Sequence, residues 1–125
     1  MYLLDPQKNR EEFLRLLEDL RECLIIVEGK HDVLALKGLG ISNIFPMNGK
    51  SPVEIVEKIY KYQNHLNCKE SSVVILTDFD AEGKKLALMF KRLLQKYHIK
   101  VNPHLRNKLK RFGRTRIEDF KRIGM

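Results

Sequence analysis

The chain has 125 residues, of which 43% are hydrophobic and 32% charged, and its formal net charge is +8. This length suits one domain with a modest core, so we expect a single domain over residues 1–125. No apolar run approaches the roughly 20 residues of a membrane-spanning helix, and the N-terminus lacks the basic-then-apolar pattern of a signal peptide. The two cysteines show neither metal-ligand spacing nor a disulfide framework. We therefore expect a cytoplasmic protein that does not enter the membrane.

The first half of the chain predicts a helix, a strand, a short helix and a second strand. Asp5 followed by Pro6 is typical of a helix start, and apolar residues then recur at helical spacing to about residue 21. The apolar run at residues 24–27 predicts a buried strand. Residues 32–37 can form a short helix, and residues 41–47 contain a second short strand.

The second half repeats this alternation. Residues 51–54, Ser-Pro-Val-Glu, combine an N-cap, a proline at the first helical position and a capping-box glutamate, and they predict a helix to about residue 66. Residues 72–77 predict a third strand, residues 82–97 a long helix, residues 99–101 a fourth strand and residues 117–123 a last short helix. This alternation predicts an α/β fold, with a central parallel sheet of about four strands flanked by helices and an extra N-terminal helix.

Two apolar runs about fifty residues apart end abruptly in acid followed by glycine. Glu28 follows the first predicted strand, and Asp78 and Asp80 follow the third. Because the carboxyl ends of parallel strands share one sheet edge, where open α/β folds bind ligands, we expect these carboxylates to lie together. Asp78 and Asp80 should face one site while Phe79 turns into the core. Carboxylate oxygens suit Mg²⁺, with Mn²⁺ as an alternative, so the three acids could form one metal site, in which Glu28 is a metal ligand or a general acid or base. The neighbouring charges should raise the pKa of Glu28.

Each of these acids has a simpler structural role open to it. Asp80 could be the N-cap of the following helix, Glu28 a solvated strand end, and Asp32 could cap the first crossover helix or brace Lys30. Glycine beside a strand end permits a close backbone approach or a positive φ, although ordinary turns use it equally. The glycines at these ends are Gly29, Gly49 and Gly83. The four histidines show no metal-ligand spacing.

The positive charge is concentrated in the last third of the chain. Residues 1–83 carry 10 basic and 14 acidic side chains, whereas residues 84–125 carry 14 basic and 2 acidic ones. This asymmetry favours a polyanionic partner, nucleic acid first and an anionic membrane surface second, with a solubilising basic tail as the simpler alternative. The predicted phosphate- or nucleic-acid-binding residues are Lys30, Lys50, Lys84, Arg106, Lys108, Lys110, Arg111, Arg114 and Arg116.

The two acidic motifs resemble those of the Toprim domain. Topoisomerases, bacterial-type primases, overcoming-lysogenisation-defect nucleases, recombination-repair proteins and the ribonuclease that matures 5S rRNA precursors share this domain. The resemblance rests on Val27-Glu28-Gly29-Lys30-His31-Asp32, on Asp78-Phe79-Asp80-Ala81-Glu82-Gly83 and on Gly49 in the second strand–helix loop. It covers about residues 22–102 and leaves a basic extension over residues 103–125. The Glu-Gly-Lys-x-Asp form is most similar to the maturation ribonuclease and to small stand-alone Toprim proteins.

The resemblance implies that Glu28 is the acid or base and that Asp78 and Asp80 are Mg²⁺ ligands. Many catalytic members carry a further acid downstream of the Asp-x-Asp pair, whereas after Glu82 this chain has only Glu118 and Asp119. It lacks a recognisable strand-passage domain of a topoisomerase, the zinc- and helicase-binding modules of a primase and a clear counterpart of the second half of the maturation ribonuclease.

Two hypotheses follow. The first is a Mg²⁺-dependent nuclease that cleaves phosphodiester bonds of structured RNA or of DNA with Glu28, Asp78 and Asp80. The second is a non-catalytic metal- and nucleic-acid-binding accessory module of an RNA- or DNA-processing or primase-like complex, favoured by the missing acid and the small size. A phosphatase or a receiver domain fits poorly, because both place paired acids after the first strand. The sequence does not choose between RNA and DNA, between one metal ion and two, or among oligomeric states.

Overall fold

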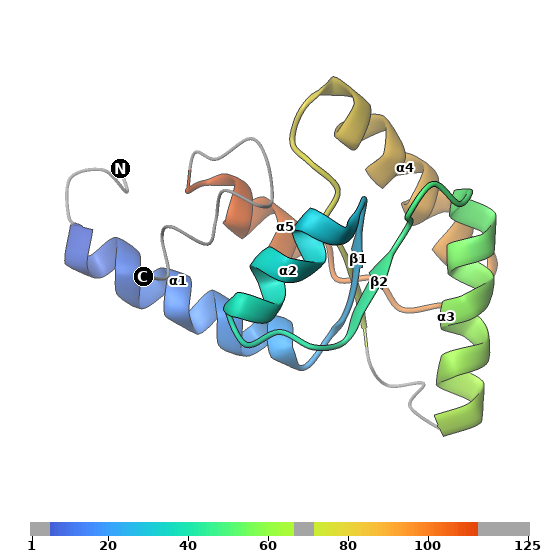
Figure 1. The fold of residues 1–125 in the computed structure, drawn as a ribbon, viewed down its shortest axis with the longest axis horizontal. Helices are drawn as coiled ribbons and strands as arrows, with labels where there is room; N and C mark the ends of the chain where they lie inside the picture. Colours follow the sequence, from blue (N-terminus) through green and yellow to red (C-terminus); the bar gives the residue numbers. More distant parts are fainter. Residues whose placement is uncertain (1–5, 67–71, 113–125) are drawn as a thin grey trace.

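The computed structural model describes residues 6–66 and 72–112. In chain order they form α1 (Pro6–Arg21), β1 (Leu24–Val27), α2 (Lys30–Gly38), β2 (Ile44–Pro46), α3 (Pro52–Leu66), β3 (Val73–Ile75), α4 (Ala81–Lys96) and α5 (Pro103–Lys110). The strands lie in the middle, with α1, α2 and α5 on one side and α3 and α4 on the other (Figure 1). The predicted cap at Asp5 and the predicted helix at residues 117–123 lie outside the described residues.

Strand β1 is the centre of a parallel sheet with the order β2-β1-β3. Its residue Ile25 pairs with Ile44 on one side and with Val74 on the other. All four residues of β1 are buried, as expected of a central parallel strand covered on both faces. Parallel pairing brings the carboxyl ends of the three strands to one edge of the sheet.

The predicted fourth strand is reduced to a single parallel bridge between Val73 and Val101. The N–H of Asn102 still donates to the carbonyl oxygen of Val73 at 2.9 Å. Pairing stops there because the Asn102 side chain caps α5 and because Pro103 has no N–H to give to a ladder. The described part of the chain therefore forms a three-stranded sheet, where the sequence predicted about four strands.

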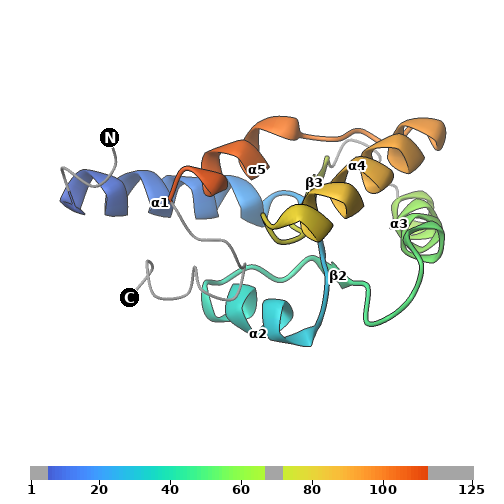
Figure 2. The same cartoon turned by 90° about the horizontal axis from the view of Figure 1, so that it is seen from above.

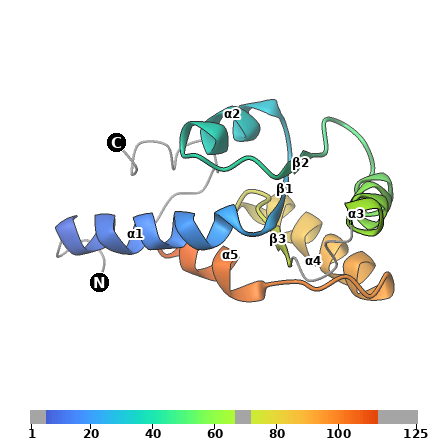
Figure 3. The ribbon, with the colours of Figure 1, turned by 90° about the horizontal axis from the view of Figure 1, so that it is seen from below.

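Alternate residues of β1 point into two separate cores. Ile25 and Val27 pack against α1, α2 and α5, whose buried side chains include Phe13, Leu16, Leu17, Leu20, Leu36, Leu105 and Leu109. Leu24 and Ile26 face α3 and α4, which contribute Ile55, Val56, Ile59, Phe90 and Leu94. Figures 2 and 3 show α1 and α5 side by side on the first of these faces. Burial on both sides fixes β1 and therefore the position of the residues that follow it.

Helix α5 belongs to the core although the sequence placed it in a basic extension. Leu105 and Leu109 are buried, and Phe112 just beyond the helix meets the ring of Phe13 edge-on, with ring centroids 5.2 Å apart. The two leucines are four residues apart and share one helix face, a signal that the surrounding basic residues masked. No helix in residues 6–66 and 72–112 is long and apolar enough to cross a bilayer.

Candidate acidic site at the carboxyl edge of the sheet

Glu28 and Asp78 meet at the carboxyl ends of two adjacent strands. Glu28 directly follows β1, and Asp78 lies in the loop between β3 and α4. Oε2 of Glu28 accepts a hydrogen bond from the backbone N–H of Asp78 at 2.7 Å, which joins positions 50 residues apart in the chain. The contact exists because β1 and β3 are neighbours and run in the same direction.

Asp80 caps helix α4. Its Oδ1 accepts a hydrogen bond from the N–H of Gly83 at 2.7 Å, with its own backbone extended. The Asp80 side chain is exposed, whereas Phe79 is buried in the core on the α1 and α5 side. One oxygen of Asp80 thus has the structural role that the sequence left open, and its role as a metal ligand stays a prediction.

The loop between β3 and α4 is fastened to the helix at Gly83. The fully buried Thr77 donates a hydrogen bond from Oγ1 to the carbonyl oxygen of Gly83 at 2.6 Å. Gly83 also packs so closely that a Cβ there would overlap the carbonyl oxygen of Asp78. The loop that carries Asp78 and Asp80 is therefore held by the side chains of Thr77 and Asp80, which both bind the backbone of Gly83.

We expect Thr77→Val to lower the free energy of unfolding by about 1 kcal/mol. Valine has nearly the shape of threonine, so the change removes the hydrogen bond to Gly83 without leaving a cavity. Urea unfolding of both proteins measures the difference. Ser42→Ala at an exposed position is the control, and its effect should stay within about 0.5 kcal/mol. Equal stability of Thr77→Val and wild type would show that this bond does not hold the loop.

Asp32 supports the turn after Glu28. It lies in the first turn of α2, and its Oδ2 accepts a hydrogen bond from the N–H of Gly29 at 3.2 Å. Burial raises the pKa of Asp32; the bond from Gly29 opposes this rise, and the charges of Asp78 and Glu28 add to it. Asp32 therefore has the helix-capping role that was one of its alternatives in the sequence.

The pKa of Glu28 is raised, as the sequence predicted, but its main cause differs from the expected one. Burial contributes most, the hydrogen bond from Asp78 lowers the pKa, and the charges of Asp78, Asp80 and Glu82 raise it again. The sequence argument rested on like charge alone, because the burial of a carboxylate at a strand end is not visible in a motif. A carboxyl group with a raised pKa is better suited to exchange a proton near neutral pH.

The acidic edge offers oxygen ligands without a ready-made metal cluster. In residues 6–66 and 72–112, no three acid, histidine or cysteine side chains come close enough to form a metal-binding group. Glu28 is turned toward the Asp78 backbone and one oxygen of Asp80 toward Gly83, and a metal site formed by all three carboxylates stays a prediction. Mg²⁺ commonly takes one or two protein carboxylates, with water and phosphate oxygens completing its shell. The donor chemistry therefore fits an ion held by the Asp pair.

The predicted basic residues divide by location. Lys30, Lys50 and Lys84 are exposed and follow the ends of β1, β2 and β3, so they lie along the acidic edge. Lys108, Lys110 and Arg111 are exposed on α5 or just after it, and Arg114 and Arg116 lie outside the described residues. The sequence did not single out Lys58 of α3, which lines a cavity of about 290 Å³ together with Lys50. The nearby ammonium group of Lys50, which has the same charge, lowers the pKa of Lys58.

Arg106 does not have the solvent-facing position expected of a phosphate contact. Its guanidinium donates hydrogen bonds to the carbonyl oxygens of Ile75, Thr77 and Asp78, at 3.1, 2.6 and 3.0 Å. It also lies over the ring of Phe79, 4.6 Å from the centroid. The sequence grouped Arg106 with its basic neighbours, since nothing in the local pattern marks the one side chain that turns toward the sheet.

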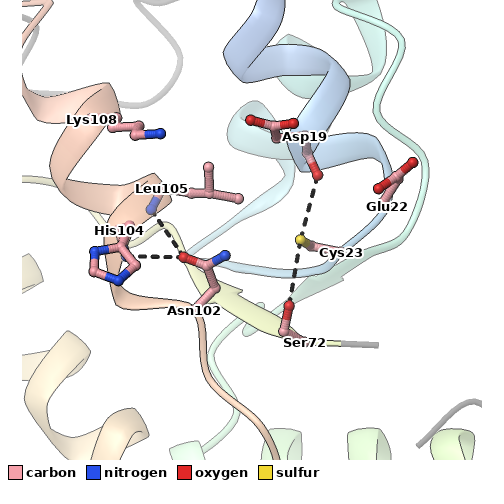
Figure 4. A pocket seen from close by; sticks show the side chains of 8 residues that line it. All are labelled: Asp19, Glu22, Cys23, Ser72, Asn102, His104, Leu105 and Lys108. Carbon is pink, nitrogen blue, oxygen red and sulfur yellow. Dashed lines mark hydrogen bonds between the residues drawn. The ribbon is translucent and has the colours of Figure 1, made fainter. Parts of the chain in front are cut away.

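A second, larger cavity lies at the opposite end of the sheet (Figure 4). It measures about 720 Å³, and Cys23 and Ser72, which precede β1 and β3, are among its lining residues. The Cys23 thiol donates to the carbonyl oxygen of Asp19, and burial raises its pKa, which disfavours a nucleophilic thiolate. We therefore assign the candidate function to the acidic edge rather than to this cavity.

Comparisons with known proteins agree with the fold. The family model of the Toprim domain matches residues 23–111. A UPF0292 protein of Methanosarcina barkeri is 37% identical over 119 residues, which cover 90% of this chain and 78% of that protein. A UPF0292 protein of Methanocaldococcus jannaschii is 31% identical over 119 residues, covering 90% and 88%. A solved structure of a protein from Aquifex aeolicus has a TM-score of 0.69 and 29% identity, covering 84% of this chain and 94% of that one.

The match confirms the resemblance carried by the two acidic motifs and the α/β fold. Its range continues past residue 102 and includes α5, in agreement with the packing of that helix. Toprim domains generally bind divalent metal ions such as Mg²⁺ and serve functions related to nucleic acids. The chain thus belongs to the Toprim domain family, among the small proteins called UPF0292.

Proposed function

We propose that this chain is a Mg²⁺-dependent nuclease that cleaves phosphodiester bonds of RNA or DNA, in the manner of a maturation ribonuclease. The observation that carries the proposal is the 2.7 Å hydrogen bond from Asp78 N–H to Glu28. It joins the glutamate motif and the Asp-x-Asp motif at one edge of the sheet. The Toprim match supports the same chemistry at the level of the family.

Each acid has its own task in this proposal. Asp78 and Asp80 would hold Mg²⁺ or Mn²⁺, and the bound ion would supply an activated water and neutralise charge on the leaving oxygen. Glu28 moves a proton to or from the reacting oxygen, a task that its raised pKa favours. Asp32 keeps the turn after Glu28 in place through its bond with Gly29.

The lysines along the acidic edge would receive the nucleic-acid backbone. Lys30, Lys50 and Lys84 are exposed beside the strand ends, where they can contact phosphates on either side of the acids. The exposed basic residues on α5 or just after it, Lys108, Lys110 and Arg111, would contact phosphates farther along the nucleic acid. The cytoplasm is the proposed compartment, since Cys23 is a free, buried thiol.

The test is metal-dependent cleavage by wild type and by Asp78→Asn. Purified protein is incubated with end-labelled structured RNA, single-stranded DNA and duplex DNA, with Mg²⁺, with Mn²⁺ or with EDTA. Wild type is expected to cleave at least one substrate when Mg²⁺ or Mn²⁺ is present, and none in EDTA. Asp78→Asn should lower its rate by a factor of about 100 or more, because an amide is a poor ligand for a hard cation and the shape is unchanged.

Glu82→Gln is the matched control for this experiment. Glu82 is exposed in the first turn of α4, so the substitution removes one nearby negative charge without changing Glu28, Asp78 or Asp80. Its cleavage rate should stay close to that of wild type. Cleavage that survives in Asp78→Asn and is lost only with EDTA would come from another nuclease and would overturn the proposal.

A non-catalytic accessory module is the second candidate function. It is favoured because Oδ1 of Asp80 is engaged as a helix cap and because no three metal-ligating side chains converge in the described residues. Such a module would bind RNA or DNA with an affinity that falls steeply with salt, and it would leave catalysis to a protein partner. Binding by wild type without cleavage under both metals would decide for this alternative.

A further inference from the structure

Among residues 6–66 and 72–112, a side chain and no full strand covers the outer edge of β3. Because Val101 bridges only Val73, the next outward-facing carbonyls of this edge belong to Ile75 and Thr77. Both accept hydrogen bonds from Nη1 of Arg106, at 3.1 and 2.6 Å. Arg106 thus stands where the missing fourth strand would have continued. A guanidinium suits this position because its planar fork can serve several carbonyls at once.

The same guanidinium reaches the residue that carries the first acid of the Asp-x-Asp motif. Nη2 of Arg106 donates to the carbonyl oxygen of Asp78 at 3.0 Å, while the N–H of Asp78 donates to Glu28 at 2.7 Å. Asp78 is therefore held through its backbone from two sides, by α5 and by the end of β1. The contact of Arg106 with the ring of Phe79 fixes the guanidinium itself.

We propose that Arg106 is a positioning residue of the acidic site, which holds the Asp78 backbone against Glu28 and so sets the direction of the Asp78 carboxylate. This inference rests on the proposed function, in which that carboxylate binds the metal ion. The effect is one of geometry: a positive charge near the acids would by itself oppose the binding of a cation. Arg106 touches neither metal nor substrate in this proposal.

The experiment uses Arg106→Gln and Arg106→Lys, with Lys100→Gln as control. Gln removes the charge and the fork, whereas Lys keeps the charge and loses only the fork. Lys100 is exposed just before α5, so its substitution removes a positive charge without disturbing the bonds of Arg106 to the backbone of β3 and Asp78, here called the clamp. Amide hydrogen exchange of Asp78 is measured without metal, and the dissociation constant for Mn²⁺ is measured by calorimetry on the folded proteins.

Both Arg106 variants are expected to behave alike. Exchange at the Asp78 amide should rise about tenfold, the factor that corresponds to the loss of one hydrogen bond. Mn²⁺ should bind about 10-fold to 100-fold more weakly, as is usual when the residue that orients a metal ligand is removed. Lys100→Gln should match wild type in both measurements. Arg106→Lys, the milder change, keeps the test valid if Arg106→Gln does not fold.

Three outcomes would overturn the proposal. Tighter Mn²⁺ binding by Arg106→Gln with normal binding by Arg106→Lys would show that Arg106 acts through its charge alone. If the Arg106 variants bind Mn²⁺ as wild type does but unfold at a lower urea concentration, Arg106 stabilises the sheet edge and does not position the metal ligand. Unchanged exchange at Asp78 would show that the clamp does not exist in solution. Failure of wild type to bind Mn²⁺ would count against the proposed function, and the exchange measurement would still decide whether Arg106 holds Asp78.

Discussion

Gly83→Ala should lower the free energy of unfolding by about 3 kcal/mol. The new Cβ would overlap the carbonyl oxygen of Asp78, a backbone atom that cannot rotate away as a side chain can. Nor can the loop move aside easily, because Thr77 and Asp80 both bind the backbone of residue 83. Urea unfolding of the variant and of wild type, followed by circular dichroism, measures the difference.

Gly29→Ala is the matched control. Gly29 also follows a strand in a Toprim motif, but its φ of −154° is open to any residue, and a Cβ added there would meet no atom within 4 Å. This substitution should change stability by less than about 1 kcal/mol, because the reduced freedom of the unfolded chain offsets the loss of glycine as the N-cap of α2. Equal losses at both positions would show that the two glycines are needed for a common reason and not for the close approach at Gly83.

The three glycines of the motifs also show how far a sequence pattern can be interpreted. The sequence placed all three beside strand ends, which fitted a close approach, a positive φ or an ordinary turn, whereas Gly83 lies in the first turn of α4. The structure gives each a different answer: a close approach at Gly83, a φ of +81° at Gly49 and open space at Gly29. Which reason applies depends on the neighbouring segment, and the motif contains no information about that segment.

The fold was predictable where local signals and topology agreed. The cap and proline at residues 51–54 predicted the start of α3, which runs from Pro52 to Leu66 as expected. The apolar run at residues 24–27 predicted β1. The third strand is shorter than predicted and the fourth is a single bridge. Strand length depends on a partner along the whole edge, and here Asn102 and Pro103 redirect the chain into α5 before that edge is covered.

The sequence predicted which residues of the site lie next to one another, but not how their side chains are oriented. Parallel strands predict that residues following β1 and β3 share an edge, and Glu28 does contact the Asp78 backbone. The orientation of the acids was not predictable, because Glu28 and Asp80 each accept a hydrogen bond from a backbone N–H that the motifs do not reveal. The sequence singled out Arg106 as a phosphate contact, but its bonds to the carbonyl oxygens of Ile75, Thr77 and Asp78 were not predictable, because they depend on a strand edge that the sequence expected to be covered.

Glu28→Gln is expected to separate stability from activity. Burial and the neighbouring carboxylates raise the pKa of Glu28 above its ordinary value of 4.5. Between that value and the folded-state pKa, the folded protein binds more protons at this residue than the unfolded chain does. Stability therefore falls as pH rises through this window, and above it the cost of holding the charge is fully present.

Glutamine removes that cost and keeps the contact, because its amide oxygen can still accept the hydrogen bond from Asp78. At neutral pH Glu28→Gln should unfold at a higher urea concentration than wild type, and the difference should vanish at acid pH, where Glu28 is protonated in both states. Glu28→Ala should instead be less stable than wild type, since it leaves the Asp78 N–H without its acceptor.

Catalysis should respond in the opposite direction. With no carboxyl group to move a proton, Glu28→Gln should cleave about 100-fold to 10,000-fold more slowly than wild type while remaining the more stable protein. Glu82→Gln, which removes an exposed acid nearby, should change neither property much. A Glu28→Gln protein that is less stable than wild type at neutral pH would mean that Asp78 N–H prefers a charged acceptor strongly enough to outweigh burial. In that case Glu28 would be a structural acceptor for the Asp-x-Asp loop, and its place as the proton-transfer group would have to be given up.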